Sequence, residues 1–342
     1  MPEGISSVGG VGSNAIETAY INMYKKGFEQ QFQQFDTRLA GYYTPVPQAS
    51  EFDFYDRIGL AEELEEVTTR YGDNPMSEIP HDRRRIGLRD WDQGKAMDPK
   101  DLVRLASDPT NAYITALKGA AHRKMDKIVI GRIFDVAYVG KSGEQAVNFV
   151  GTTTDKITVG AMSAGTSRPI TTTGKFALTA GDYEGVDINV SYDLTTTGTA
   201  TGLTLDKLKA IRLTAERLEG IQEGDMLDMW ITANQASQLL NIAEMVNMDY
   251  TTRAALQEGR VTQFMGFNFR RCEFLLGSGT AGDPRQCIVS RPDTMKVAYS
   301  KNLTFDMWKL TAKKNIPYMY LSLGMDAVRM WGETAFRVNC LD

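Results

Sequence analysis

Apolar residues recur at steps of three and four along several stretches of the chain, a spacing that predicts amphipathic helices. The longest stripe follows Asp108, which suits an N-cap, and Pro109, which suits the first helical position, and it extends to about residue 137. A helix of this length would measure roughly 43 Å at 1.5 Å per residue. We therefore predict one long buried helix around which other elements are arranged. Shorter helices are predicted over 14–39, from Thr204 and from Asn234.

Elsewhere the apolar positions alternate with polar ones or form short, mostly apolar runs, and both patterns predict β-strands. The mostly apolar run at 226–232 is typical of a buried strand, whereas the alternating positions near the C-terminal end are typical of strands buried on one face. The strands that we expect are 226–232, 267–274, 287–289, 319–327 and 336–340. Helices and strands in this order predict an α+β fold that includes a compact mixed α/β unit.

Residues 1–15 are expected to form an extended N-terminal arm, which is followed by an amphipathic helix. Glycine and serine are frequent in residues 1–15, which cannot pack as a regular element. The helix predicted next carries an aromatic face that includes Phe28, Phe32 and Phe35. Because an arm offers little surface of its own to cover these rings, we expect them to contact a neighbouring molecule.

Residues 51–97 are expected to form a long, highly charged β-hairpin about a tip rich in glycine, asparagine and proline. Its first arm, 51–66, holds seven acidic residues and Arg57 as its one base, whereas its second arm, 83–89, holds four arginines and no acid. Opposite charges would therefore face each other. Neither arm has enough apolar residues to cover a core face, so we expect another molecule to cover the hairpin. Candidate contact residues are Glu62, Glu63, Glu65, Glu66, Arg83, Arg84, Arg85 and Arg89.

Residues 139–203 differ in composition, because threonine and glycine are frequent and large aliphatic side chains are few. This composition favours short exposed strands and loops, and we interpret the stretch as a surface insertion or an elaborated loop. A glycan-binding module is the alternative. The aromatic residues Phe176, Tyr183 and Tyr192 are isolated, however, and do not form the clusters that stack on sugars.

Composition and charge argue against catalysis and against tight binding to polyanions. The 342 residues are 42% hydrophobic and carry a formal net charge of -5, so nothing attracts the chain as a whole to nucleic acid or anionic lipid. The two histidines, His81 and His122, and the three cysteines, Cys272, Cys287 and Cys340, lack the spacing of metal ligands. We predict no catalytic residue, no metal site, no cofactor and no membrane span.

Neighbouring carboxylates leave one enzymatic alternative open. Glu63 and Glu66 are of the residue type that supplies the acid and the base of a glycosidase. Such an enzyme needs two carboxylates set in a cleft with different environments, and the sequence shows only a crowded acidic segment. We therefore interpret this segment as a solvated or partner-facing surface.

The order of these parts resembles the Hong Kong 97-type (HK97-like) major capsid protein of tailed bacteriophages, and the resemblance covers essentially the whole chain. The parts are the arm, the charged hairpin, the long helix, the mixed unit and the closing strands. The segments that carry the resemblance are DPKDLVR at 98–104, MWITANQ at 229–235, GFNF at 266–269 and AFRVNC at 335–340.

The resemblance implies an HK97-like fold and a division of the chain. Residues 1–50 would be the N-terminal arm, 51–97 the extended loop, and 98–138 the spine helix of a peripheral domain. The remaining parts would be the threonine-rich insertion or peripheral loop at 139–203, the axial domain at 204–283, and the closing strands of both domains at 284–342.

The resemblance also implies a function without catalysis. The chain would be the major capsid protein that self-assembles, as hexamers and pentamers, into an icosahedral phage head enclosing double-stranded DNA without binding it specifically. A separate scaffolding protein, a portal and a decoration or cement protein would be its partners, and the shell would assemble in the bacterial cytoplasm and persist in the virion. The alternatives are the shell protein of an encapsulin-type nanocompartment and, more remotely, the glycosidase or a glycan-binding tail module.

Overall fold

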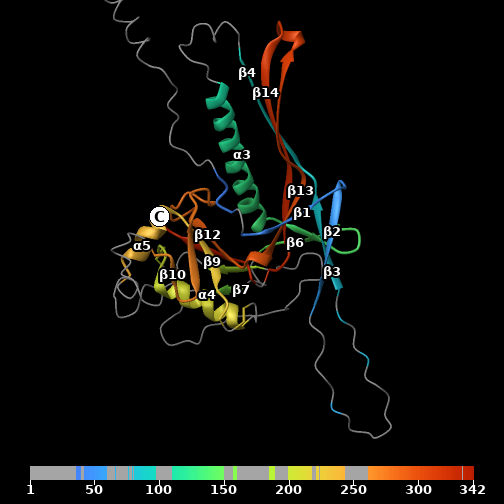
Figure 1. Ribbon diagram of the computed structural model, residues 1–342. Helices are drawn as coiled ribbons and strands as arrows, with labels where there is room; N and C mark the ends of the chain where they lie inside the picture. Colours follow the sequence, from blue (N-terminus) through green and yellow to red (C-terminus); the bar gives the residue numbers. More distant parts are fainter. Residues whose placement is uncertain are drawn as a thin grey trace, which may run out of the picture. The chain divides into compact units, whose positions relative to one another are not determined.

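The fold is described from a computed structural model of the chain (Figure 1). The described residues are 36–39, 42–59, 66, 76, 79, 81–97, 110–149, 157–159, 185–188, 199–217, 221–222, 224–242, 261–332 and 334–342. The chain divides into two compact units. The small unit consists of Met1–Thr37, Asp90–Met125 and Lys301–Gly324. The large unit consists of Arg38–Arg89, Asp126–Ser300 and Met325–Asp342.

The small unit combines part of a sheet with the first part of a long helix. β4 (Asp90–Ala96) pairs antiparallel with β14 (Ile316–Arg329), and β14 also neighbours β13 (Met295–Leu310). The first part of α3 (Thr110–Ile133) lies alongside these strands in Figure 1. Helix and sheet meet in a core made of Met97, Leu117, Ala121, Met319 and Leu321.

A seven-stranded sheet forms the larger part of the large unit, in the order β10-β11-β9-β12-β15-β8-β7. Strand β9, which lies between β11 and β12, is buried at every position, as its mostly apolar sequence predicts. β15 alternates between buried and half-buried positions, which confirms the predicted half-buried strand. The strands are β7 (Ile157–Val159), β8 (Val186–Ile188), β9 (Leu227–Ile231), β10 (Gln263–Phe264), β11 (Phe267–Arg271), β12 (Arg285–Ser290) and β15 (Phe336–Cys340).

The large unit also holds a four-stranded sheet in the order β2-β3-β5-β6. Strands β2 and β3 form the predicted antiparallel hairpin, with Phe52 opposite Gly87 at one end of the ladder and Ile58 opposite His81 at the other. β1 (Thr44–Pro47) pairs in parallel with the start of β13. The four strands are β2 (Phe52–Ile58), β3 (His81–Gly87), β5 (Ala137–Val139) and β6 (Gln145–Val147).

The helices largely follow the predicted stripes. α3 begins just after Pro109, and α4 (Leu205–Arg217) buries Leu208 and Ile211 on its apolar side. The expected N-cap of α5 (Ala233–Leu240) is wrong by two positions, because the extended residue at the start is Thr232, whose N–H donates to the Gln235 side chain over 3.1 Å. The helix predicted over 14–39 falls largely outside the described residues, and the described residues 36–39 are not helical.

The expectation of exposed strands in the threonine-rich stretch is wrong for the strands that the structure describes there. Val147 on β6 and Val186 and Ile188 on β8 are all fully buried. β8 pairs in parallel with β15, so this stretch contributes to the seven-stranded sheet. A few apolar residues suffice when the strand lies inside a sheet whose other strands come from distant parts of the chain.

Short 3₁₀ turns complete the fold. The first, Pro292–Thr294, precedes β13, and the second, Thr311–Lys313, lies between β13 and β14. Lys314 and Asn315, which follow the second turn, both adopt the left-handed conformation with φ of 55°. The strand pair β13 and β14 is therefore joined by a tight connection.

The buried hydroxyl of Tyr42 makes stability sensitive to alkaline pH. It lies 2.5 Å from Ser290 Oγ, and the ring meets Trp230 edge-on at 5.2 Å. Burial raises the pKa of Tyr42 well above its ordinary value of 10.0. Above pH 10 the unfolded chain therefore releases this proton while the folded chain keeps it, so stability is full below pH 10 and falls as pH rises beyond it. We expect the melting temperature to fall less steeply above pH 10 in Tyr42→Phe than in the wild type, and equal slopes would contradict this.

Candidate functional site

The β2–β3 hairpin carries its charges in pairs across the two strands. In the antiparallel register Asp56 lies opposite Arg83, and Arg57 lies opposite Asp82. A hydrogen bond of 2.8 Å joins the first pair, and one of 2.9 Å joins the second. Since neighbouring side chains on a strand point to opposite faces, the two pairs lie on opposite faces of the sheet. The predicted facing of opposite charges is confirmed for these two pairs.

The face that carries Arg57 and Asp82 is buried. Their side chains are 1% and 6% exposed, and the fully buried Arg84 lies 3.5 Å from the same carboxylate. Arg57 also donates to the carbonyl oxygen of Met330 over 2.9 Å, and its guanidinium lies 5.6 Å from the ring centre of Trp331. The Asp82 carboxylate therefore pairs with two guanidinium groups that water scarcely reaches.

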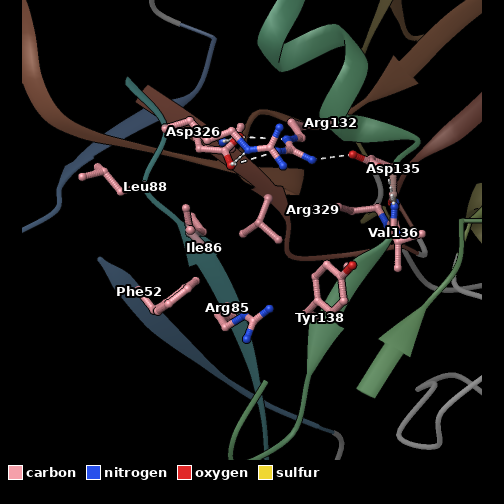
Figure 2. Close-up of a pocket in the computed structure, with 15 residues that line it drawn as sticks. Phe52, Arg85, Ile86, Leu88, Arg132, Asp135, Val136, Tyr138, Asp326 and Arg329 are labelled. Carbon is pink, nitrogen blue, oxygen red and sulfur yellow. Dashed lines mark hydrogen bonds and ion pairs between the residues drawn. The ribbon is translucent and has the colours of Figure 1, made fainter. Parts of the chain in front are cut away.

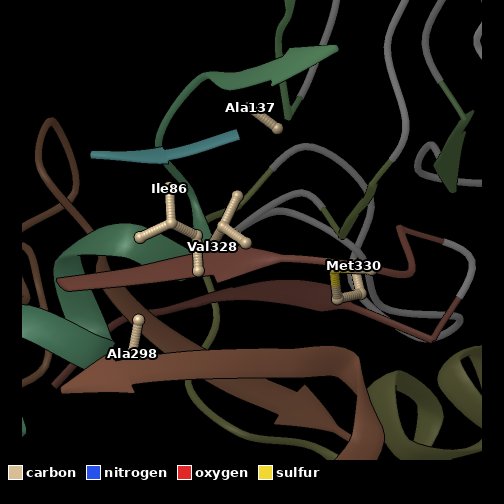
Figure 3. Close-up of a cluster of buried hydrophobic side chains, with 5 residues drawn as sticks. All are labelled: Ile86, Ala137, Ala298, Val328 and Met330. Atoms are coloured by element: carbon tan, nitrogen blue, oxygen red, sulfur yellow. The ribbon is translucent and has the colours of Figure 1, made fainter. Parts of the chain in front are cut away.

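Two expectations about the hairpin are wrong for this buried face. Arg84 is not a surface residue, because strand alternation places it on the inward side with Ile86, and we remove it from the candidate contact residues. The hairpin also covers a core face, since Ile86 packs against buried residues from distant parts of the large unit (Figure 3). These residues are Ala137, Ala298, Val328 and Met330. Arginine stems add apolar surface that a count of apolar residues misses.

The opposite face of the hairpin is an exposed layer of rings and cations, which we call the aromatic–arginine face and define as Phe52, Phe54, Arg83, Arg85 and Tyr138. The three rings are 46%, 38% and 42% exposed, in that order. The Arg85 guanidinium lies 4.9 Å from the ring centre of Phe52 and 5.0 Å from that of Tyr138. Arg83 lies 5.9 Å from the ring centre of Phe54. Exposed aromatic area of this extent is typical of an interaction surface.

A cavity of about 280 Å³ opens beside this face (Figure 2). On one wall Arg132, from the end of α3, donates to Asp326 over 2.8 and 3.0 Å and also contacts Asp135. Burial lowers the pKa of Arg132, but the hydrogen bonds to both carboxylates outweigh this effect and raise it, so the guanidinium stays charged. Arg85, Arg89 and Arg329 complete the charged lining.

The structure places only some of the predicted contact residues. Arg83, Arg85 and Arg89 lie on or beside the aromatic–arginine face, and Arg89 comes within 3.5 Å of Asp326. Glu66 is exposed. The calls for Glu62, Glu63, Glu65, Phe28, Phe32 and Phe35 concern residues outside the described part of the chain.

Sequence analysis missed the aromatic members of this site. Phe52 and Phe54 occupy alternate positions of the first arm, which is the signal of a shared strand face, but the acidic residues around them obscured it. No sequence signal indicates that Arg132 meets Asp326, because the two residues are 194 positions apart. Long-range pairs of this kind become apparent only once the three-dimensional arrangement of the strands is known.

The described residues also bear on the requirements of a disulfide, a metal site and a membrane span. The three cysteines there are buried and form no disulfide. No group of three His, Cys, Asp or Glu side chains in these ranges is arranged to hold a metal ion. Among the helices described above, none combines the length and the hydropathy that crossing a membrane requires.

Solved phage capsids share this fold over nearly the whole chain. The capsid of cyanophage P-SCSP1u is 14% identical, with a TM-score of 0.63 over 92% of this chain and 91% of that one. Mycobacterium phage Che8 is 10% identical, with a TM-score of 0.61 over 92% and 95%. The mature capsid of bacteriophage PhiM1 is 13% identical, with a TM-score of 0.59 over 92% and 90%. These likenesses confirm the predicted HK97-like fold, whereas no curated protein sequence matches the chain.

The family is identified by sequence. A family model described as phage capsid protein matches residues 16–342, which include the hairpin, all three described sheets and all the described helices. This match confirms the predicted structural, non-enzymatic function as major capsid protein of the phage head. The chain therefore belongs to the phage capsid protein family.

Proposed function

We propose that identical copies of this capsid protein close into an icosahedral head of hexamers and pentamers, and that the β2–β3 hairpin supplies contacts between neighbours. The observation that carries the proposal is the aromatic–arginine face, with three large exposed rings that come from β2 and β5 of one sheet. Contacts between different patches of identical chains can repeat around a closed shell. Covering these rings would then link stability to assembly.

The proposed contact residues extend beyond the described part of the chain. Acidic side chains of one copy would meet Arg83, Arg85 or Arg89 of another, and the rings of the N-terminal arm would pack on a neighbour. Exposed ion pairs contribute at most about 1 kcal/mol each, so they orient the copies more than they bind them. The residues involved would be Glu62, Glu63, Glu65, Glu66, Phe28, Phe32 and Phe35.

The remaining partners follow from the same proposal. A separate scaffolding protein would guide assembly in the bacterial cytoplasm, a portal would occupy one vertex, and a decoration or cement protein would bind the finished shell. The net charge of -5 supports a container that encloses double-stranded DNA without binding it tightly. The mature protein would reside in the virion.

Removal of residues 1–35 tests the role of the arm. We expect negative-stain electron microscopy to show closed shells for the full chain, expressed with a scaffolding protein of its phage, and none for the truncated chain. The truncation spares the anchor of the arm, where the backbone N–H of Arg38 donates to Asp126 over 3.0 Å. Its melting temperature should therefore stay close to that of the unassembled full chain. Shells of normal yield from the truncated chain would contradict the proposed role of the arm. Shells filled with a cargo enzyme would contradict the proposal that the protein forms a phage head.

A further inference from the structure

We infer that the cavity beside Arg85 receives a carboxylate from the acidic segment 62–66 of a second copy of this chain. The inference rests on the proposed function and names the partner of one site within it. The site is formed by Arg85, stacked between two rings, and by the charged wall of the cavity.

Neighbouring residues position the Arg85 side chain so that it can bind a partner. Its guanidinium lies between the rings of Phe52 and Tyr138, and Figure 2 shows it in this position. Its stem packs closely against Gly143, where φ is +65° and an added Cβ would lie 2.7 Å from Arg85 Cδ. Stacked rings cover the flat faces of a guanidinium and leave its N–H edge open, which is the edge that binds a carboxylate in a bidentate manner.

The described part of the chain gives Arg85 no carboxylate. Arg83 differs from it, because Arg83 is bound to Asp56 in the same hairpin. The two carboxylates that line the cavity are also engaged, since Asp326 and Asp135 both bind Arg132. Arg85 therefore has stacking partners but no carboxylate partner among the described residues.

The charge of the cavity favours an anion. Four arginines line it against two aspartates, which leaves an excess of two positive charges. The arginines are Arg85, Arg89, Arg132 and Arg329, and the aspartates are Asp135 and Asp326. A concave site with an excess of one charge attracts a segment of the opposite charge.

The acidic segment of the hairpin has the complementary charge. Residues 62–66 hold four glutamates, and Glu66 is exposed. No ion pair joins Glu66 to another described residue. Because every copy carries both the cavity and the segment, each copy can donate to one neighbour and accept from another.

The direction of the hairpin favours a second copy over the same chain. Arg85 lies opposite Phe54, and β2 continues from there to Ile58, which lies opposite His81. Four residues of strand carry the chain roughly 13 Å along the ladder, away from Arg85, before the acidic segment begins. This separation favours the acidic segment of a second copy over that of the same chain as the occupant of the cavity.

Charge reversal followed by charge exchange tests the inference. We expect Arg85→Glu to lower the yield of closed shells at least tenfold while the melting temperature of the unassembled chain stays within a few degrees of the wild type. Changing Glu62, Glu63, Glu65 and Glu66 to lysine should do the same, and combining both changes should restore shells. Lys209→Glu, which makes the same charge change at an exposed position of α4, is the matched control and should keep the wild-type yield. Normal shells from Arg85→Glu would overturn the inference.

Cross-linking identifies the occupant. Residues 51–94 contain no lysine, so Arg85→Lys adds a single amine to the hairpin. Shells assembled from a mixture of ¹⁵N-labelled and unlabelled Arg85→Lys chains, treated with a carbodiimide and digested with trypsin, should yield Lys-to-Glu links between the peptide at position 85 and peptide 58–70. Pairs of one labelled and one unlabelled peptide support a second copy.

Two other results overturn the inference. Links made only between peptides of the same label would place the segment of the same chain in the cavity. Well-formed shells without any link to peptide 58–70 would exclude the segment as its occupant. A wild-type chain that forms no shells with its scaffolding protein would instead contradict the proposed function, so the two failures are distinguishable.

Discussion

Replacing Asp82 with alanine is expected to lower the free energy of unfolding of the unassembled chain by about 3–5 kcal/mol. The Asp82 carboxylate pairs with Arg57 at 2.9 Å and with Arg84 at 3.5 Å, and all three side chains are almost completely buried. Its removal leaves two guanidinium groups in the interior without this anion. Denaturant unfolding followed by circular dichroism measures the loss.

Asp56 provides the matched control for this prediction. It pairs with Arg83 on the same two strands, but the two side chains are 65% and 42% exposed. Water and salt screen such a pair, so Asp56→Ala should cost no more than about 1 kcal/mol. Equal losses of unfolding free energy in the two variants would show that burial does not determine how much the Asp82 ion pair stabilises the fold.

Replacing Lys207 with methionine is expected to cost at least about 3 kcal/mol, because hydrogen bonds to a charged group are each worth about 1.5–3 kcal/mol. The buried Lys207 ammonium donates to the carbonyl oxygens of Thr201, Gly202 and Asn339 over 2.8, 2.7 and 2.9 Å. It thereby ties α4 to the segment before it and to β15. Methionine fills a similar volume but leaves three inward carbonyl groups without this donor.

Lys209→Met is the control on the same helix. The Lys209 side chain is 51% exposed and lies 3.9 Å from Asp206, so its loss should change the free energy of unfolding by less than about 0.5 kcal/mol. Thermal and denaturant unfolding of both variants would be compared with the wild type. A Lys207→Met variant as stable as Lys209→Met would contradict the structural role of the buried ammonium.

The elements that the sequence predicts well are those with a strong local pattern. α3 follows from an N-cap, a proline and a long apolar stripe, and the structure begins it at Thr110. β9 follows from a mostly apolar run, and β15 follows from strict alternation. In each case the neighbouring side chains alone decide which face is buried.

The hairpin shows where local patterns fail. Arg83, Arg84 and Arg85 are identical in hydropathy, yet Arg84 is fully buried while its two neighbours belong to the exposed face. The burial of Arg84 and Ile86 depends on residues such as Val328, which lies more than 200 positions further along the chain. A sequence pattern within one strand does not reveal which distant strand will cover it. A triple reversal of these arginines would therefore disturb the core as well as the surface, and single changes at Arg85 separate the two.

The position of β15 in the seven-stranded sheet constrains the order of events during translation. β15 lies between β12 and β8, and it is the last of the three to be synthesised. Arg337 on β15 bonds to Asp187 on β8, 150 residues earlier. At 5–20 residues per second the ribosome needs roughly 8 to 30 s to make that interval. Strands β7 and β8 therefore cannot join the sheet until β15 has been synthesised. The subunit is completed only when synthesis of the strands of its sheet is almost over.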